Sequence, residues 1–111
     1  MDSVLSQPDR GGWRRRTAGA DAALPADWWE RLDQATRGRW AGAPFLTDAA
    51  AEAAREAPVD TWLLLHPATG RQLRLTWGSD SLVLCDLLAR RCERARVETP
   101  VLQSLRTEAT R

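Results

Sequence analysis

Apolar and polar residues alternate most clearly in residues 60–77, which read DTWLLLHPATGRQLRLTW. Two Leu-rich runs flank a Pro-Ala-Thr-Gly segment, a pattern typical of a β-hairpin. A three-residue loop with Gly70 in the left-handed conformation gives the register with the most apolar face, because it places Leu63 opposite Leu75. This register predicts a buried face with Leu63, Leu65, Leu73, Leu75 and Trp77. The other, mixed face then carries Trp62, Leu64, His66, Gln72, Arg74 and Thr76.

Helical spacing predicts two helices before this hairpin. The first begins at DWWE, where Asp27 is the expected cap and Glu30 has the spacing of a capping box. Its apolar stripe is formed by Trp28, Leu32 and Ala35. The second helix covers residues 46–58, LTDAAAEAAREAP, because its Ala run has high helix propensity and its final Pro ends the helix.

Residues 80–96, DSLVLCDLLARRCERAR, follow the hairpin and also keep helical spacing, with Leu84, Leu88, Arg91 and Ala95 on one side. We therefore predict a helix there. The first half, SLVLC, fits a third strand as well, since a short apolar run is ambiguous between the two. The alternative of a strand at residues 81–85 stays open.

These elements predict a small single domain of the α+β class, with two N-terminal helices, a β-hairpin at about 59–77 and a helix at about 80–96. Residues 1–20 contain Gly and Pro with little apolar periodicity, and we expect a flexible arm there. The domain itself is predicted to span residues 21–97, followed by a tail or short helix at 98–111. No internal repeat is evident.

The amino-acid composition argues against some classes of function. The 111 residues carry a formal net charge of +1, which argues against a strongly basic nucleic-acid binder. All 16 basic residues are Arg, and Lys, Ile, Asn and Tyr are absent, as expected of a G+C-rich bacterial, phage or plasmid gene. No apolar stretch approaches the roughly 20 residues of a membrane span, and no secretory signal order is present. We expect a cytoplasmic protein without a membrane partner.

Catalytic and metal chemistry has little support in the residue pattern. Cys85 and Cys92 would lie roughly 10 Å apart on one helix, so we predict two free, buried thiols. His66 is the only His, with no recognised nucleophile or ligand spacing around it. A Gly-rich phosphate loop is also missing. The sequence predicts no enzyme activity, no cofactor and no bound metal.

The six Trp residues suggest a partner-binding surface, since a core this small is expected to hold only two or three of them. Trp and Arg are common anchors at the centre of protein interfaces. The leading hypothesis is a small non-enzymatic interaction or regulatory protein that binds another protein or a second copy of itself. The predicted partner-binding residues are Trp62, Leu64, Arg74 and Trp40.

A nucleic-acid-binding protein is the alternative hypothesis. Acidic residues predominate in residues 17–60, whereas Arg predominates in residues 71–96 and in the segment GGWRRR of the arm. Phosphate binding would use stacking and charge on this basic half. Its predicted residues are Trp13, Arg14, Arg15, Arg16, Arg71, Arg90, Arg91 and Arg94. The competing interpretation is that the acidic half neutralises these Arg residues within the chain.

Overall fold

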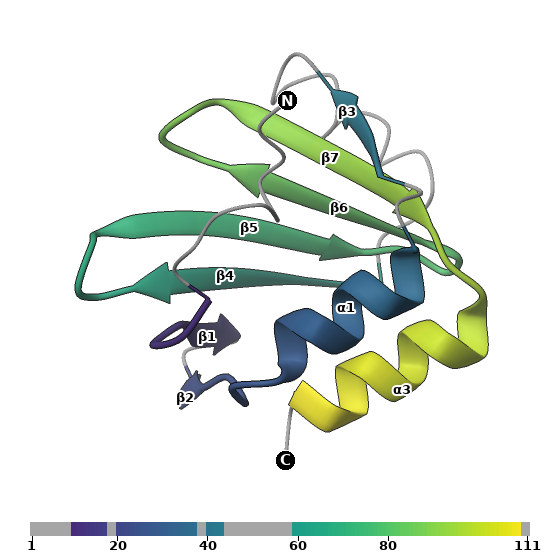
Figure 1. The fold of residues 1–111 in the computed structure, drawn as a ribbon, viewed down its shortest axis with the longest axis horizontal. Coiled ribbons are helices and arrows are strands. Elements are labelled where there is room, and N and C mark those ends of the chain that lie inside the picture. Colours follow the sequence, from purple (N-terminus) through teal and green to yellow (C-terminus); the bar gives the residue numbers. More distant parts are fainter. Residues whose placement is uncertain (1–9, 18–19, 38–39, 44–58, 110–111) are drawn as a thin grey trace.

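The computed structural model describes residues 10–17, 20–37, 40–43 and 59–109, and these contain seven strands and two helices (Figure 1). The strands are β1 (Arg14–Thr17), β2 (Ala20–Ala23), β3 (Ala41–Ala43), β4 (Asp60–His66), β5 (Arg71–Trp77), β6 (Ser81–Asp86) and β7 (Arg91–Arg96). The helices are α1 (Trp28–Thr36) and α3 (Thr99–Ala109).

All seven strands form one antiparallel sheet in the order β2-β1-β4-β5-β6-β7-β3. Its centre, β4 to β7, is a meander in which each strand pairs with the next one along the chain. The predicted fold of two N-terminal helices, a hairpin and a further helix is therefore wrong, because the described chain is mostly sheet. The predicted helix at residues 46–58 lies outside the described residues.

The β4–β5 hairpin forms where the pattern predicts it, but its register differs by one residue. His66 pairs with Arg71, so the loop contains four residues rather than three, and Leu63 lies opposite Arg74. Gly70 has the predicted left-handed conformation, with φ of 73°. The backbone N–H groups of Thr69 and Gly70 both donate to the carbonyl of His66 and close the longer loop.

This register reverses the predicted faces of β4. The buried residues of the hairpin are Trp62, Leu64, His66, Leu73, Leu75 and Trp77, whereas Leu63 and Leu65 are only half-buried on the opposite face. The predicted face of β5 is correct. The prediction chose the register that places the most Leu residues on one face, and this register is wrong. Burying the two large Trp side chains stabilises the fold more than burying Leu63 and Leu65 does.

Residues 80–96 form a second hairpin, β6–β7, and the predicted helix there is wrong. The alternative of a strand in its first half is confirmed. All six residues of β6 are buried, so the period-two alternation that identifies a half-buried strand is missing.

The two hairpins are built alike. Both have a four-residue loop whose last residue, Gly70 or Arg90, is left-handed. Residues at a constant offset occupy equivalent positions: Asp60 and Asp80, Leu64 and Leu84, Arg71 and Arg91, and Arg74 and Arg94. The chain therefore contains a repeated hairpin that the sequence alone did not reveal.

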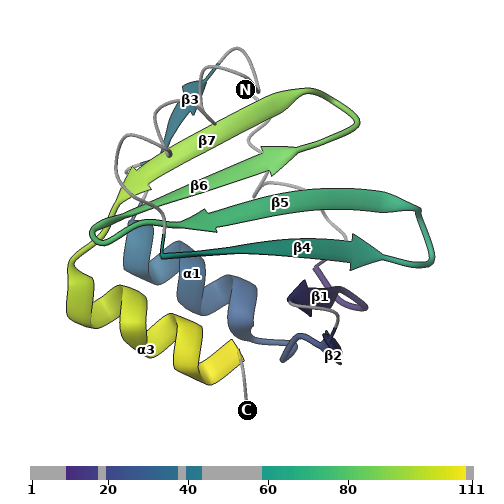
Figure 2. The same ribbon diagram turned by 180° about the vertical axis from the view of Figure 1, so that it is seen from behind.

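Both helices pack against one side of the sheet, and they run side by side in opposite directions (Figures 1 and 2). Helix α1 begins after Asp27 as predicted, but Asp27 makes no side-chain cap and pairs with Arg31 instead. The predicted tail at residues 98–111 contains α3, which packs Leu102 and Leu105 into the core. The principal apolar core lies between this helical layer and the inner face of the sheet.

The described part of the predicted arm, residues 10–17 and 20, contributes β1 and the first residue of β2 to the sheet. Strand β1 lies between β2 and β4, and Trp13 is only 3% exposed in the core. The indole of Trp13 lies edge-on to Trp29 and to His66. Trp13 thus supplies apolar burial that the Gly-rich composition of this segment did not suggest.

Cys85 and Cys92 form a disulfide, which contradicts the prediction of two free thiols. They lie directly opposite each other on β6 and β7, with 4.0 Å between their Cα atoms. The predicted separation assumed one helix, whereas a hairpin brings residues on either side of its loop together.

Candidate functional site

The side of the sheet that faces away from the helices carries an aliphatic and basic surface. Alternation along the strands places these residues on one face, which we call the outer face. The register aligns Arg16, Leu63 and Arg74 in one row across β1, β4 and β5, and Arg14, Leu65 and Gln72 in the next. These six residues define the Leu–Arg patch.

Leu63 and Leu65 are half-buried at the middle of the patch, and polar side chains flank them on both neighbouring strands. Because adjacent strands are about 4.8 Å apart, the backbones at Arg16 and Arg74 are roughly 10 Å apart. An apolar centre with guanidinium groups at its rim is typical of a protein interface.

The charged side chains of this patch are all Arg, and Asp21 of β2 lies beside them, opposite Arg16. Arg14 pairs with Asp21 through its Nε at 2.8 Å. Neither Arg16 nor Arg74 has an ion pair within the part of the chain that the structure describes. The outer-face positions of β4, β5, β6 and β7 contain no Asp or Glu.

Part of the outer face is buried on its β6–β7 side. Val83, Cys85 and Cys92 form a second apolar cluster there, with Leu87 packed against it. These side chains are buried, whereas Arg94 is half-buried and Arg96 exposed on β7, so the accessible part of this face consists of the Leu–Arg patch, its neighbours on β4 and β5, and these two Arg residues.

Of the four predicted partner-binding residues, only Arg74 lies on this surface. Trp62 and Leu64 are fully buried on the inner face, and Trp40 is half-buried against the principal core. Leu63 and Leu65, which the sequence pattern placed on the buried face, lie on this surface instead. A usable signal existed, because only an even-numbered loop places Trp62 and Trp77 on the same face of the hairpin.

The predicted nucleic-acid-binding residues do not form one surface. Trp13 is buried in the core, and Arg14, Arg16 and Arg94 lie on the outer face, whereas Arg15, Arg71 and Arg91 have the parity of the inner face. Arg90 occupies the β6–β7 loop.

Two of these guanidinium groups have structural contacts on the inner side. Arg71 pairs with Asp86 at 2.9 Å and lies 5.5 Å from the ring centroid of Trp13. Arg15 lies over the ring of Trp62 at 5.1 Å. These cation–π and ion-pair contacts occupy two of the seven cations that the nucleic-acid hypothesis needs.

Asp60 connects the sheet to the last helix. Its Oδ2 accepts hydrogen bonds from the Trp62 indole at 2.9 Å and from Arg106 at 3.0 Å, and its Oδ1 accepts one from the backbone N–H of Thr61. Burial of the carboxylate raises its pKa, but the hydrogen bonds from Trp62, Arg106 and Thr61 outweigh burial and lower the pKa of Asp60 below its ordinary value. The ionised carboxylate of Asp60 therefore has a structural role in this fold.

His66 also makes structural contacts. It is buried at the end of β4, with its ring edge-on to Trp13 at 5.1 Å. Among the described residues, no three His, Cys, Asp or Glu side chains are grouped closely enough to hold a metal ion.

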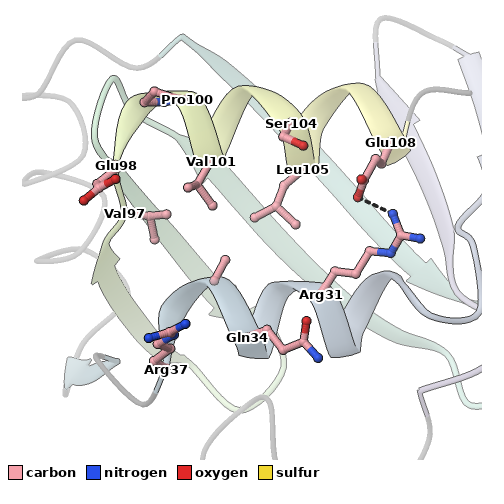
Figure 3. A pocket seen from close by; sticks show the side chains of 11 residues that line it. Arg31, Gln34, Arg37, Val97, Glu98, Pro100, Val101, Ser104, Leu105 and Glu108 are labelled. Atoms are coloured by element: carbon pink, nitrogen blue, oxygen red, sulfur yellow. Dashed lines mark ion pairs between the residues drawn. The ribbon is translucent and has the colours of Figure 1, made fainter.

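A groove of about 760 Å³ lies between α1 and α3 (Figure 3). Its apolar lining includes Val97, Val101 and Leu105. An ion pair of 2.6 Å between Arg31 and Glu108 joins the two walls at one end. The hydrogen bond that Arg31 donates to Glu108 raises the pKa of Arg31 above its ordinary value, and the negative charge of Asp27 adds to this effect.

The other end of the groove contains Arg37 on the α1 wall and Glu98 on the α3 wall (Figure 3). Both are exposed, and their side chains have no ion pair within the described ranges. Neither residue is among the predicted binding residues.

No helix in the described ranges is long and apolar enough to cross a membrane. Comparison with protein-family models, curated proteins and solved structures gives no match to this chain.

Proposed function

We propose that this protein is a non-enzymatic interaction module that binds an acidic segment of a partner protein at the Leu–Arg patch. The observation that supports this proposal most directly is the pair of guanidinium groups, Arg16 and Arg74, on either side of half-buried Leu63. A partner with an aliphatic or aromatic side chain over Leu63 and carboxylates beside it would match both the shape and the charge of the patch.

A protein partner fits this surface better than a nucleic acid does. Sequence-independent binding of single strands uses aromatic platforms on which bases stack. Five of the six Trp side chains are buried, and none of the described outer-face residues is aromatic. The net charge of +1 also provides little long-range attraction for a phosphate backbone.

A second copy is a poor partner for this same patch. Packing two outer faces together would bring Arg14, Arg16 and Arg74 of one copy near the same residues of the other. Like charges that meet across an interface are destabilising. The patch therefore favours a partner of opposite charge.

Site-specific photocrosslinking tests the proposal. A photoreactive amino acid replaces exposed Gln72 in the patch or, as the control, exposed Gln103 on α3. We expect a crosslinked protein from Gln72 only, with an acidic peptide at the crosslink, in cells of the organism that encodes the chain. Arg74→Glu should abolish the product, whereas Arg90→Glu, the same charge change in the β6–β7 loop, should leave it unchanged.

Other results would contradict the proposal. A nuclease-sensitive product at Gln72 would favour nucleic acid. Equal crosslinking from Gln72 and Gln103, or a product that persists with Arg74→Glu, would show that the Leu–Arg patch is not the binding site.

A further inference from the structure

The walls of the α1–α3 groove have opposite charge. The α1 wall carries Arg31 and Arg37, and the α3 wall carries Glu98 and Glu108. Figure 3 shows that Arg37 and Glu98 lie at one end and that Arg31 and Glu108 lie at the other. Each end of the groove therefore has one cation and one anion on facing walls.

Within the part of the chain that the structure describes, an ion pair neutralises one of these two ends and not the other. Arg31 and Glu108 form an ion pair across the groove, whereas Arg37 and Glu98 have no ion pair within the described residues. Each unpaired charge suits its own helix end, because Arg37 follows the C-terminus of α1 and Glu98 precedes the N-terminus of α3. Their placement on facing walls is an additional feature that the helix dipoles do not require.

We propose that a second copy of this chain docks groove to groove, related by a two-fold axis that runs along the groove. Rotation about this axis exchanges the two walls but keeps each end in place. It therefore lays α1 of each copy over α3 of the other. Arg37 then meets Glu98 of the second copy, and the same pair forms again by symmetry.

The charge pattern selects this axis over the alternative. A two-fold axis across the groove would keep each wall on its own side and exchange the ends, so Arg37 would meet Arg31 of the second copy. That arrangement brings like charges together on both walls. It is therefore unfavourable, as is the packing of two outer faces.

Apolar contact at the centre of the groove adds to this pairing. Val101 is 37% exposed and projects from α3, while Val97 and Leu105 form the floor beneath it. The two-fold axis brings the Val101 side chains of both copies toward the same central region. Burying exposed apolar surface there favours association, and the charged ends determine the orientation.

This dimer is independent of the Leu–Arg patch. The helices cover the inner face of the sheet, so docking through the helices leaves both outer faces available. The dimer would then present two patches on opposite sides and could bind a partner that carries two acidic segments with increased avidity. Failure of the dimer would leave the proposed function of a single patch unaffected.

Charge-reversal variants analysed by sedimentation equilibrium test the proposal. We expect the wild-type chain to dimerise, and Arg37→Glu alone or Glu98→Arg alone to raise the dimer Kd about tenfold or more, since each opposes like charges twice per dimer. Mixing the two single variants should restore dimerisation, because both pairs in the mixed dimer again have opposite charge. An effect confined within one chain would not be rescued by mixing.

Two further variants accompany the charge reversals. Arg90→Glu makes the same charge change far from the groove and should leave the Kd unchanged, and Val101→Asp should weaken the dimer without relying on ion pairs. Circular dichroism verifies that each variant is folded. A monomeric wild-type chain, single variants that dimerise normally, or a mixture that stays monomeric would each overturn the proposal.

Discussion

The indoles of Trp62 and Trp77 pack edge to face across β4 and β5, with 4.7 Å between their ring centroids. Both are 1% exposed or less, and Trp28 contacts both rings from α1. The Trp62 indole N–H donates to Asp60, and the guanidinium of Arg15 lies over the ring. Trp62 is therefore a central residue of the principal core and is inaccessible to a partner.

Replacement of Trp62 by Ala should lower the free energy of unfolding by about 3–5 kcal/mol, because it leaves a large cavity and removes the donor to Asp60. Urea denaturation measures this loss. Leu63→Ala, the neighbouring truncation on the outer face, is the matched control and should cost about 1 kcal/mol or less, since Leu63 is only half-buried. A larger loss for Leu63 than for Trp62 would contradict the observed register.

Substitution of Asp60 by Asn should destabilise the protein by about 1–3 kcal/mol at neutral pH, because its carboxylate accepts three hydrogen bonds. Asp80, the equivalent residue of the second hairpin, pairs only with exposed Arg96. Asp80→Asn should therefore have an effect of less than about 1 kcal/mol. Similar losses for the two variants would show that the interior contacts of Asp60 are unimportant.

The contribution of Asp60 to the free energy of unfolding should decrease as the pH is lowered. Its pKa in the folded state is lowered, so its ionised form stabilises the fold at neutral pH and above its unfolded-state pKa. This contribution is lost as the pH falls through the folded-state value. Denaturation of the wild type and of Asp60→Asn across acidic pH should show their stabilities converging at the acid end, whereas a constant difference would contradict this assignment.

Removal of the disulfide by Cys85→Ala with Cys92→Ala should lower the free energy of unfolding by about 2–3 kcal/mol, the value expected for a short closed loop. Thiol titration in denaturant checks the bond directly. We expect no reactive thiol before reduction and two after it. Two thiols in the unreduced protein would restore the original sequence prediction.

Truncation of Trp13 to Ala should lower the free energy of unfolding by about 3–5 kcal/mol, as for other buried aromatic residues. Each kcal/mol corresponds to about 4–8 °C in Tm for a domain of this size. Thermal denaturation followed by circular dichroism provides the measurement. A Tm within a few degrees of the wild type would mean that Trp13 contributes little to the core.

The sequence predicted those elements whose signals are local. The β4–β5 hairpin, the left-handed Gly70 and the beginning of α1 after Asp27 all follow from residues close together in the chain. The register did not follow, because it depends on where Trp62 and Trp77 meet Trp28 of a distant helix. Local sequence shows only that an even-numbered loop would place Trp62 and Trp77 on one face, and it contains no information about the helix that covers that face.

Two further elements escaped prediction for related reasons. Strand β6 is buried on both faces, so its apolar run also fits a helix. Strand β1 is rich in Arg and follows Gly residues, and only its pairing with β2 and β4 and the burial of Trp13 show it to be part of the core. For the same reasons, the sequence did not show that Trp13, Trp62 and Leu64, three of the predicted binding residues, are buried.

The strand order has a consequence for how the chain is synthesised. Strands β4 to β7 pair in succession, so these contacts can form as soon as residues 59–97 have been made. Strand β1 leaves the ribosome earlier, but its partner β4 follows only after a long intervening segment. During that interval Trp13, Trp28 and Trp29 have no sheet to cover them. The nascent chain is therefore most prone to aggregation before its second half emerges, and faster translation through residues 59–77 would shorten the exposure.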